Sequence, residues 1–292
     1  MPDIDAYRAK LDAILASVDR LSDAQLRAAV AALNDARSAI IDRLVAAAKG
    51  GNTYSATVLT SLIADMQRIA AEYERRLGQS MEGALRRAWN LGAATLPDAW
   101  DAAGIGETFR IGLDTRLLDI ASQLTADLVR DVSQNFITTV SREIRMGALG
   151  ALSVNETIRR VRALLSTQPD RITARFGPIL SQAERIVRTE IMRAYSLANE
   201  ARLRQASEMV PGLRKYWLAT PDARTRDTHI AAWHRYQPGG SVGPIPVKDD
   251  FIVGGFPAAY PYDPRLPARE SINCRCRSAT WHPDWFSKEE AA

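Results

Sequence analysis

The feature that most constrains this fold is a helical pattern that extends from Ile4 to about Ser166. Apolar residues recur there at spacings of three and four, which places them on one face of an α-helix. Leu91 is followed by Gly92, Pro97 and further glycines, which predicts a helix end there and an irregular connector over 96–112. The first part of the chain is therefore predicted to consist of long amphipathic helices.

Two further helices follow from local signals. A Ser-x-x-Glu capping box begins at Ser153 and predicts a helix over about 154–165, because the serine and glutamate side chains can satisfy free backbone amides. Apolar residues along one face predict a longer helix over about 179–207. Glu200 and Arg204 are four residues apart on this helix, which favours an ion pair.

The character of the sequence changes at Pro211-Gly212. Four of the six tryptophans, all three histidines, both cysteines and most of the prolines lie beyond this point. Short β-type runs at Leu213 to Ala219, Asp250 to Val253 and Cys274 to Trp281 predict a small antiparallel sheet in a separate module. We therefore expect an α+β protein whose N-terminal two-thirds is mostly helical, divided into a helical region 1–112, a long-helix region 113–212 and a small α+β module 213–292.

The net charge of +4 is unevenly distributed. Residues 1–174 carry 21 basic and 21 acidic groups, residues 175–235 carry 11 and 6, and residues 236–292 carry 6 and 7. The basic stretch can neutralise DNA phosphates without reading the base sequence, pair with an acidic protein surface, or form a solvated face balanced by nearby glutamates. The candidate contact residues are Arg185, Arg188, Arg193, Arg202 and Arg204.

The sequence also bears on the compartment. The segment Met1 to Asp5 lacks the basic start and apolar run of a signal peptide. No apolar stretch approaches the ~18–20 residues that span a bilayer. We therefore expect a soluble protein, made in the cytoplasm, without a membrane anchor. The two cysteines, Cys274 and Cys276, are too few for a disulfide framework.

Three short motifs follow one another along the second half of the chain. They are Arg188-Thr189-Glu190 with Arg193, then a run from Trp217 to His229 that contains Asp222-x-Arg224-Thr225-Arg226, and then Asn273-Cys274-Arg275-Cys276-Arg277. With Glu270 between the second and third motifs, residues 150–282 resemble the head-morphogenesis domain of tailed phages, the family of phage Mu protein F. The residues that we assign to this motif network are Glu190, Trp217, Asp222, Arg224, Arg226, His229 and Asn273.

The resemblance implies a non-enzymatic minor head protein. Such a protein is a low-copy virion component that is made in the host cytoplasm and is located in the head interior or at the portal vertex. Its implied partners are the portal protein, the capsid and scaffold proteins, and the packaged DNA. From the residues alone, the same set also suits a buried polar network that stabilises a small domain. Asp222 and Arg226, four residues apart, favour an ion pair within that network.

The histidines and cysteines raise a metal hypothesis. Thiolates and imidazoles are the ligands that zinc prefers, so a structural zinc site would use His229, Cys274, Cys276 and His282. Against this, two cysteines at i and i+2 on a regular strand point to opposite faces. The alternative is two small buried thiols beside hydrogen-bonded imidazoles. No other cofactor is expected.

An enzyme can also be built from these residues. His229 or His234 could act as a general base beside Arg224 and Arg226, in a hydrolase-like or toxin-like site. The sequence lacks a paired-carboxylate metal site, a glycine-rich phosphate loop and a nucleophile elbow. We therefore assign no catalytic residue, and we retain a sequence-independent nucleic-acid-binding module as the main alternative to the head protein.

Overall fold

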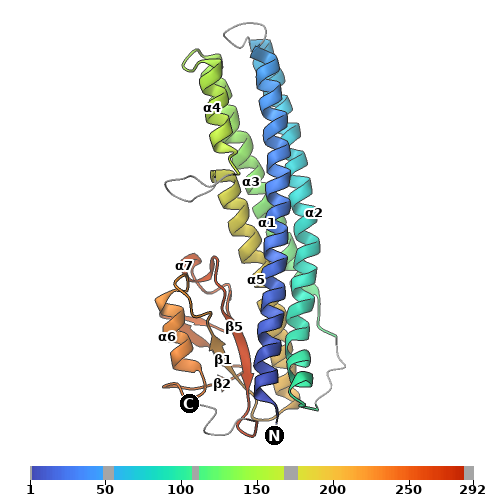
Figure 1. Ribbon diagram of the computed structural model, residues 1–292, viewed down its shortest axis with the longest axis vertical. Coiled ribbons are helices and arrows are strands. Elements are labelled where there is room, and N and C mark those ends of the chain that lie inside the picture. The colour runs from blue at the N-terminus through green and yellow to red at the C-terminus, as the bar shows by residue number, and fades with distance from the viewer. Residues whose placement is uncertain (1, 49–55, 107–111, 168–176, 286–292) are drawn as a thin grey trace. The chain divides into compact units, whose positions relative to one another are not determined.

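The computed structural model describes residues 2–48, 56–106, 112–167 and 177–285 (Figure 1). Its α+β architecture agrees with the prediction: long helices are followed by a small region of short antiparallel strands. No helix within the described ranges is long and apolar enough to cross a membrane. The five longest helices are α1 (Ile4–Ala48), α2 (Ala56–Ala102), α3 (Arg116–Ala148), α4 (Val154–Leu164) and α5 (Pro178–Met209).

The chain forms two compact units, each built from separated segments. The sheet unit comprises Met1–Ser22, Ala84–Ala121 and Arg188–Ala292, and the helical unit comprises Asp23–Gly83 and Ser122–Val187. The helices α1, α2, α3 and α5 each contribute residues to both units. The division therefore differs from the three consecutive ranges expected from the sequence, because a long helix can supply buried faces to two units.

The core of the helical unit follows the predicted periodicity. Fully buried side chains recur along α1, α2 and α3, and the rings of Tyr73 and Phe136 meet edge-on with centroids 6.0 Å apart. Ser153 caps α4 as predicted, accepting the backbone N–H of Glu156 at 3.1 Å. The glutamate carboxylate pairs with Arg159 and Arg160. The first turn of α4 was thus predictable from its local sequence.

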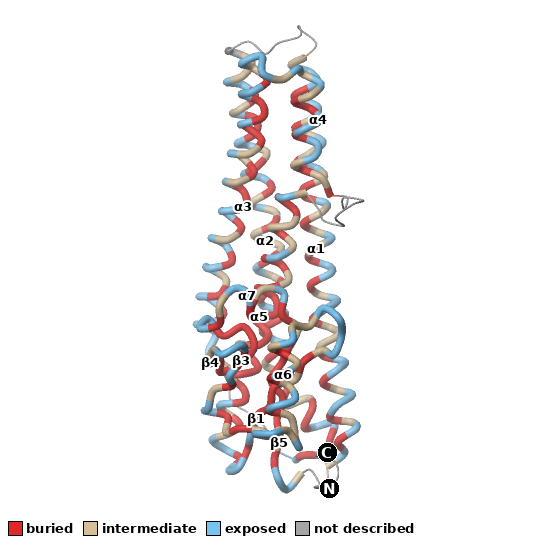
Figure 2. Tube along the Cα trace, turned by 90° about the vertical axis from the view of Figure 1, so that its left-hand side faces the viewer, coloured by how far each residue is buried: buried red, intermediate tan, exposed pale blue. Residues whose placement is uncertain are grey.

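The sheet unit contains two small antiparallel sheets. The first has the strand order β2 (Ile245–Pro246), β1 (Arg214–Leu218), β5 (Arg277–Trp281), and the second pairs β3 (Phe251–Val253) with β4 (Phe256–Ala258). Two short helices, α6 (Asp227–Tyr236) and α7 (Ala268–Ser271), lie between strands in the chain. Figure 2 marks the buried residues of β1 and of α5 in red.

The core of the small sheet includes side chains from the start of α1 and the end of α2 as well as from the C-terminal strands. Tyr7, Trp100, Leu213 and Ala279 belong to one buried cluster. The Tyr7 hydroxyl lies 2.7 Å from Oγ1 of Thr280 and accepts the Thr280 backbone N–H at 3.0 Å. Strands of two to five residues bury little surface by themselves, so the sheet completes its core with the first turns of α1 and the end of α2.

The predicted break between Leu91 and Pro97 was also wrong, because α2 continues to Ala102. A Cβ atom at Gly92 would lie 2.1 Å from the carbonyl oxygen of Tyr195, so this glycine allows α2 and α5 to pack closely. Pro97 remains inside the helix. Both residues that suggest a break in isolation are accommodated by contacts with α5.

Candidate metal centre

His229 is the centre of a buried cluster in the sheet unit. It is the third residue of α6 and its side chain is 1% exposed. Its Nδ1 atom lies 3.2 Å from Sγ of Cys276 and 3.5 Å from Sγ of Cys274. On the other side of the ring, Nε2 lies 3.2 Å from Oε2 of Glu270. The Trp217 ring meets the imidazole edge-on, with centroids 5.5 Å apart.

The two cysteines reach His229 because they precede β5 rather than lie on it. The prediction of a strand over 274–281 was wrong at its start, since β5 begins at Arg277. Asn273 has φ 55°, in the left-handed region that asparagine tolerates, and this turns the chain just before Cys274. The backbone N–H of Cys276 donates to Sγ of Cys274 at 3.3 Å. The donor atoms of His229, Cys274 and Cys276 all lie within 4.8 Å of one another.

The environment shifts the pKa values of the two thiols in opposite directions. Burial opposes ionisation of Cys274, but hydrogen bonds with Cys276 and His229 outweigh it, so the pKa of Cys274 lies below its ordinary value. The hydrogen bond to Cys274, together with burial, raises the pKa of Cys276. The arrangement thus favours one thiolate next to an imidazole.

His282, the fourth predicted metal ligand, does not join the cluster. Its Nε2 atom lies 3.0 Å from the carbonyl oxygen of Pro211, and its Nδ1 atom accepts the backbone N–H of Asp284 at 3.2 Å. Both ring nitrogens are therefore engaged elsewhere, and the structure does not bring His282 together with the other three predicted ligands. His234 is exposed and stacks on the Trp233 ring.

The Asp222 carboxylate holds the segment that carries the cysteines. Nη1 of Arg275 donates to Asp222 at 2.7 Å, and Nη2 of Arg275 donates to its other oxygen. The Arg224 backbone N–H donates to Asp222 at 2.9 Å. Hydrogen bonds from Arg275 place the pKa of Asp222 below its ordinary value. The clamp joins the loop after β1 to the residue between the two cysteines.

Arg226 does not pair with Asp222, in contrast to the prediction. Instead its Nη2 atom donates to the carbonyl oxygen of Ile272 at 2.5 Å. The Asn273 backbone N–H donates to Oγ1 of Thr189 on α5 at 3.3 Å. The i,i+4 rule fails here because Arg226 is the residue before α6 and not part of a helix shared with Asp222.

Glu270 and Thr228 are functional candidates whose place in the site is not predicted by the sequence pattern. Oγ1 of Thr228 donates to Oε2 of Glu270 at 2.8 Å. A Cβ atom at Gly254 would lie 2.7 Å from Oε1 of Glu270, so this glycine makes room for the carboxylate. Glu270 is on α7, and only the tertiary structure places it next to His229. Its position between the second and third motifs was the one available signal.

The predicted arginine surface is largely engaged within the sheet unit. Nη1 of Arg193 donates to both carboxylate oxygens of Glu190 at 2.7 and 2.6 Å. Arg202 is buried, and Arg204 forms the predicted pair with Glu200 at 2.9 Å. Of the remaining candidates, Arg185 is exposed and Arg188 is half-buried.

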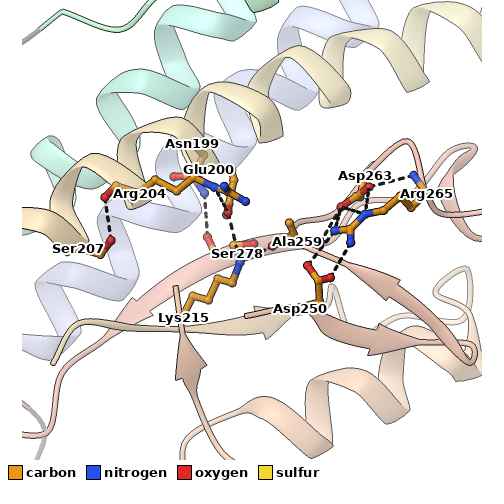
Figure 3. Close-up of polar contacts among 10 residues, drawn as sticks. All are labelled: Asn199, Glu200, Arg204, Ser207, Lys215, Asp250, Ala259, Asp263, Arg265 and Ser278. Carbon is orange, nitrogen blue, oxygen red and sulfur yellow. Dashed lines mark hydrogen bonds and ion pairs between the residues drawn. The ribbon is translucent and has the colours of Figure 1, made fainter. Parts of the chain in front are cut away.

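Lys215 anchors β1 to α5 (Figure 3). It is 0% exposed, and its Nζ atom donates to the carbonyl oxygen of Ala259 at 2.6 Å and to Glu200 at 3.3 Å. Burial lowers the pKa of Lys215 and raises that of Glu200. The residue pattern of this basic stretch does not predict a buried lysine.

A second carboxylate network lies near the second sheet (Figure 3). Arg265 donates to Asp250 at 2.6 Å and 2.8 Å and also contacts Asp263. The Asp263 carboxylate accepts the Ala259 backbone N–H at 2.7 Å. Asp263 therefore fixes the same turn whose carbonyl oxygen binds Lys215.

Comparisons with known proteins match only part of this chain. No family model matches the chain, and no solved structure matches it. One curated protein, the NAD(+)--arginine ADP-ribosyltransferase EFV of Enterococcus faecalis, is 35% identical over 97 residues. The matched segment is 32% of this chain and spans 18% of that protein's length. The match leaves most of both proteins unaligned.

Proposed function

We propose that this chain is a minor capsid protein of a tailed phage, which associates with the portal protein and assists head assembly, DNA packaging or DNA delivery. The observation that supports this proposal is the convergence of the motif residues. Asp222, Arg226 and His229, all from the second motif, contact the segment from Glu270 to Cys276, which contains most of the third motif. Contacts between the second and third motifs are the observation that we offer in support of the proposal.

The proposed location is the virion, in the head interior or at the portal vertex. The proposed partners are the portal, capsid and scaffold proteins, with the packaged DNA as a further contact. The network acts as a structural support in this proposal, because its central histidine and cysteines are buried. A support of this kind holds a small domain in one conformation while other surfaces bind the partners.

The test is made in the phage or induced prophage whose genome encodes this chain. Purified particles should contain the chain in few copies, and a whole-particle reconstruction should place it near the portal. Deletion of the gene should lower the number of infectious particles. Complementation with Asp222→Ala should restore less infectivity than complementation with Asp227→Ala, because Asp222 binds Arg275 of the third motif whereas Asp227 lies exposed at the start of α6. Absence of the chain from particles, together with unchanged infectivity of the deletion, contradicts the proposal.

ADP-ribosyl transfer is the enzymatic candidate raised by the comparison. The shared segment is less than a fifth of the E. faecalis protein, so its named activity need not come from that segment. We propose a non-enzymatic role for this chain. Incubation of the purified chain with labelled NAD and arginine-containing protein should give no transfer of label. Transfer that is lost in His229→Ala but retained in His234→Ala would favour the enzyme instead.

A further inference from the structure

The buried cluster has the ligand types and spacing of a zinc site. A tetrahedral zinc ion with bonds of about 2.3 Å to sulfur and about 2.0–2.1 Å to nitrogen separates a sulfur from a nitrogen ligand by about 3.6 Å. Nδ1 of His229 lies 3.2 Å and 3.5 Å from the two sulfur atoms. The three side chains therefore already stand near the positions that they would hold around an ion.

The Nε2 side of the His229 ring also has the surroundings expected of a zinc ligand. A histidine that binds zinc through one ring nitrogen commonly donates the other N–H to a carboxylate. Nε2 of His229 is buried, has no aligned hydrogen-bond partner among the described residues, and lies 3.2 Å from the Glu270 carboxylate. Metal binding at Nδ1 would fix the proton on Nε2, where it faces Glu270.

We propose that His229, Cys274 and Cys276 bind one zinc ion, and that Glu270 is a positioning residue that orients His229. Three protein ligands leave the fourth position of a tetrahedral ion to a group outside this set, such as water. The ion would join α6 to the segment before β5, two parts of the chain more than 40 residues apart. The proposal does not depend on the capsid function.

Burial favours a structural over a catalytic ion. His229 is 1% exposed, Cys274 is 3% exposed and Cys276 is 1% exposed. A substrate would have to displace protein to reach the centre. The expected role is stabilisation of the sheet unit, since an ion that binds only the folded chain shifts the folding equilibrium toward that state.

The first test measures metal content. The full chain, expressed with zinc in the medium and purified without chelators, should contain one zinc ion per chain by elemental analysis. Cys274→Ser and Cys276→Ser should each lose the metal. His282→Ala and His234→Ala are matched controls that should retain it, because neither ring faces the cluster.

A second measurement does not require the variants to fold. The wild-type chain, stripped of metal, is titrated with Co²⁺, which should give thiolate-to-cobalt charge-transfer absorption that saturates at one equivalent and disappears when zinc is added. Zinc should also raise the thermal midpoint of unfolding. Wild-type protein without zinc, without a cobalt band and with an unchanged midpoint overturns the proposal.

Glu270→Gln tests the positioning role. Loss of an outer carboxylate partner typically weakens metal affinity by about 10–100-fold. The variant should therefore still bind one cobalt ion with the same thiolate band. The chelator concentration that removes this ion should be about 10–100-fold lower than for the wild type. Unchanged affinity in Glu270→Gln would contradict the role of Glu270 and leave the three ligands to be judged by metal content.

Discussion

Arg202 donates from Nε to the carbonyl oxygen of Ala93 at 3.1 Å, and this carbonyl is the one that Pro97 leaves without a helical partner. A residue in a helix donates its N–H to the carbonyl four positions earlier, but proline has no N–H. The guanidinium of α5 therefore replaces the missing hydrogen bond of α2. This contact explains both why α2 passes through Pro97 and why Arg202 is buried.

Arg202→Met should destabilise the protein. The variant removes the charged Arg202 donor from the Ala93 carbonyl, and a hydrogen bond to a charged group contributes about 1.5–3 kcal/mol. The free energy of unfolding, measured by denaturant titration, should fall by that amount. The matched background is Pro97→Ala, which restores a backbone N–H, so Arg202→Met should cost less there. Equal costs in both backgrounds would show that the two residues are not coupled.

Gly92→Ala should also be destabilising. The added Cβ meets the Tyr195 carbonyl oxygen at 2.1 Å, so α2 and α5 must separate. Overpacking of this kind typically costs about 1–3 kcal/mol. Gly78→Ala is the control within the same helix, because nothing lies within 4 Å of its added Cβ. That variant should gain up to about 1 kcal/mol from helix propensity, so opposite signs of the two changes in unfolding free energy are the expected result.

Lys215→Met should lower the free energy of unfolding more than the double variant that removes both charges. Removal of one partner from a buried ion pair costs about 3–5 kcal/mol, because the other charge stays buried. Glu200 keeps its contact with Arg204 but loses Lys215. Addition of Glu200→Gln to Lys215→Met should recover part of the loss in a thermal or denaturant titration. A double variant that is no more stable than Lys215→Met would show that the ion pair itself is unimportant.

The Arg265 network predicts a dependence of stability on acid pH. The Arg265 hydrogen bond lowers the pKa of Asp250, and for Asp263 hydrogen bonds from Arg265 and from backbone amides outweigh the opposing effect of burial. A carboxyl whose pKa is lower in the folded state stabilises that state above its unfolded pKa of about 4. This stability is lost as the pH falls through the folded pKa.

The measurement is the free energy of unfolding as a function of pH. Asp263→Asn should lose about 1.5–3 kcal/mol at neutral pH, the range for a hydrogen bond to a charged group. Its stability should then fall less steeply below pH ~4 than that of the wild type. Arg265→Met is the control, since it removes the cause of the lowered pKa values and should flatten the same part of the curve. An acid limb as steep as the wild type in both variants would assign the pH dependence to other carboxylates.

Local signals determined much of the fold. The spacing of apolar residues predicted that the chain to about Ser166 is mostly helical and that a long helix follows over about 179–207, which corresponds to α5. The capping box predicted the start of α4 at Val154. The run Leu213 to Ala219 predicted β1. These features depend on residues within one or two turns or along one strand, so the sequence contains all the information that they need.

The candidate site was predicted only in part. The sequence brought His229, Cys274 and Cys276 into one hypothesis because they are chemically alike, but it included His282 and assigned no role to Glu270. The left-handed turn at Asn273 decides where the thiols point, and the contact with Pro211 decides where His282 points. Neither is a property of the residue types alone.

The sequence by itself thus determined the α+β class, the long helices and the small set of residues able to bind metal. Only the tertiary structure decided that α2 continues through Pro97, that the sheet shares its core with Tyr7 and Trp100, and that Arg202 and Lys215 are buried with partners inside the protein. The physical reason is the distance along the chain over which each interaction acts. Periodicity and capping act between neighbours in the chain, whereas a buried arginine, lysine or thiolate is stabilised by partners that folding brings from distant segments.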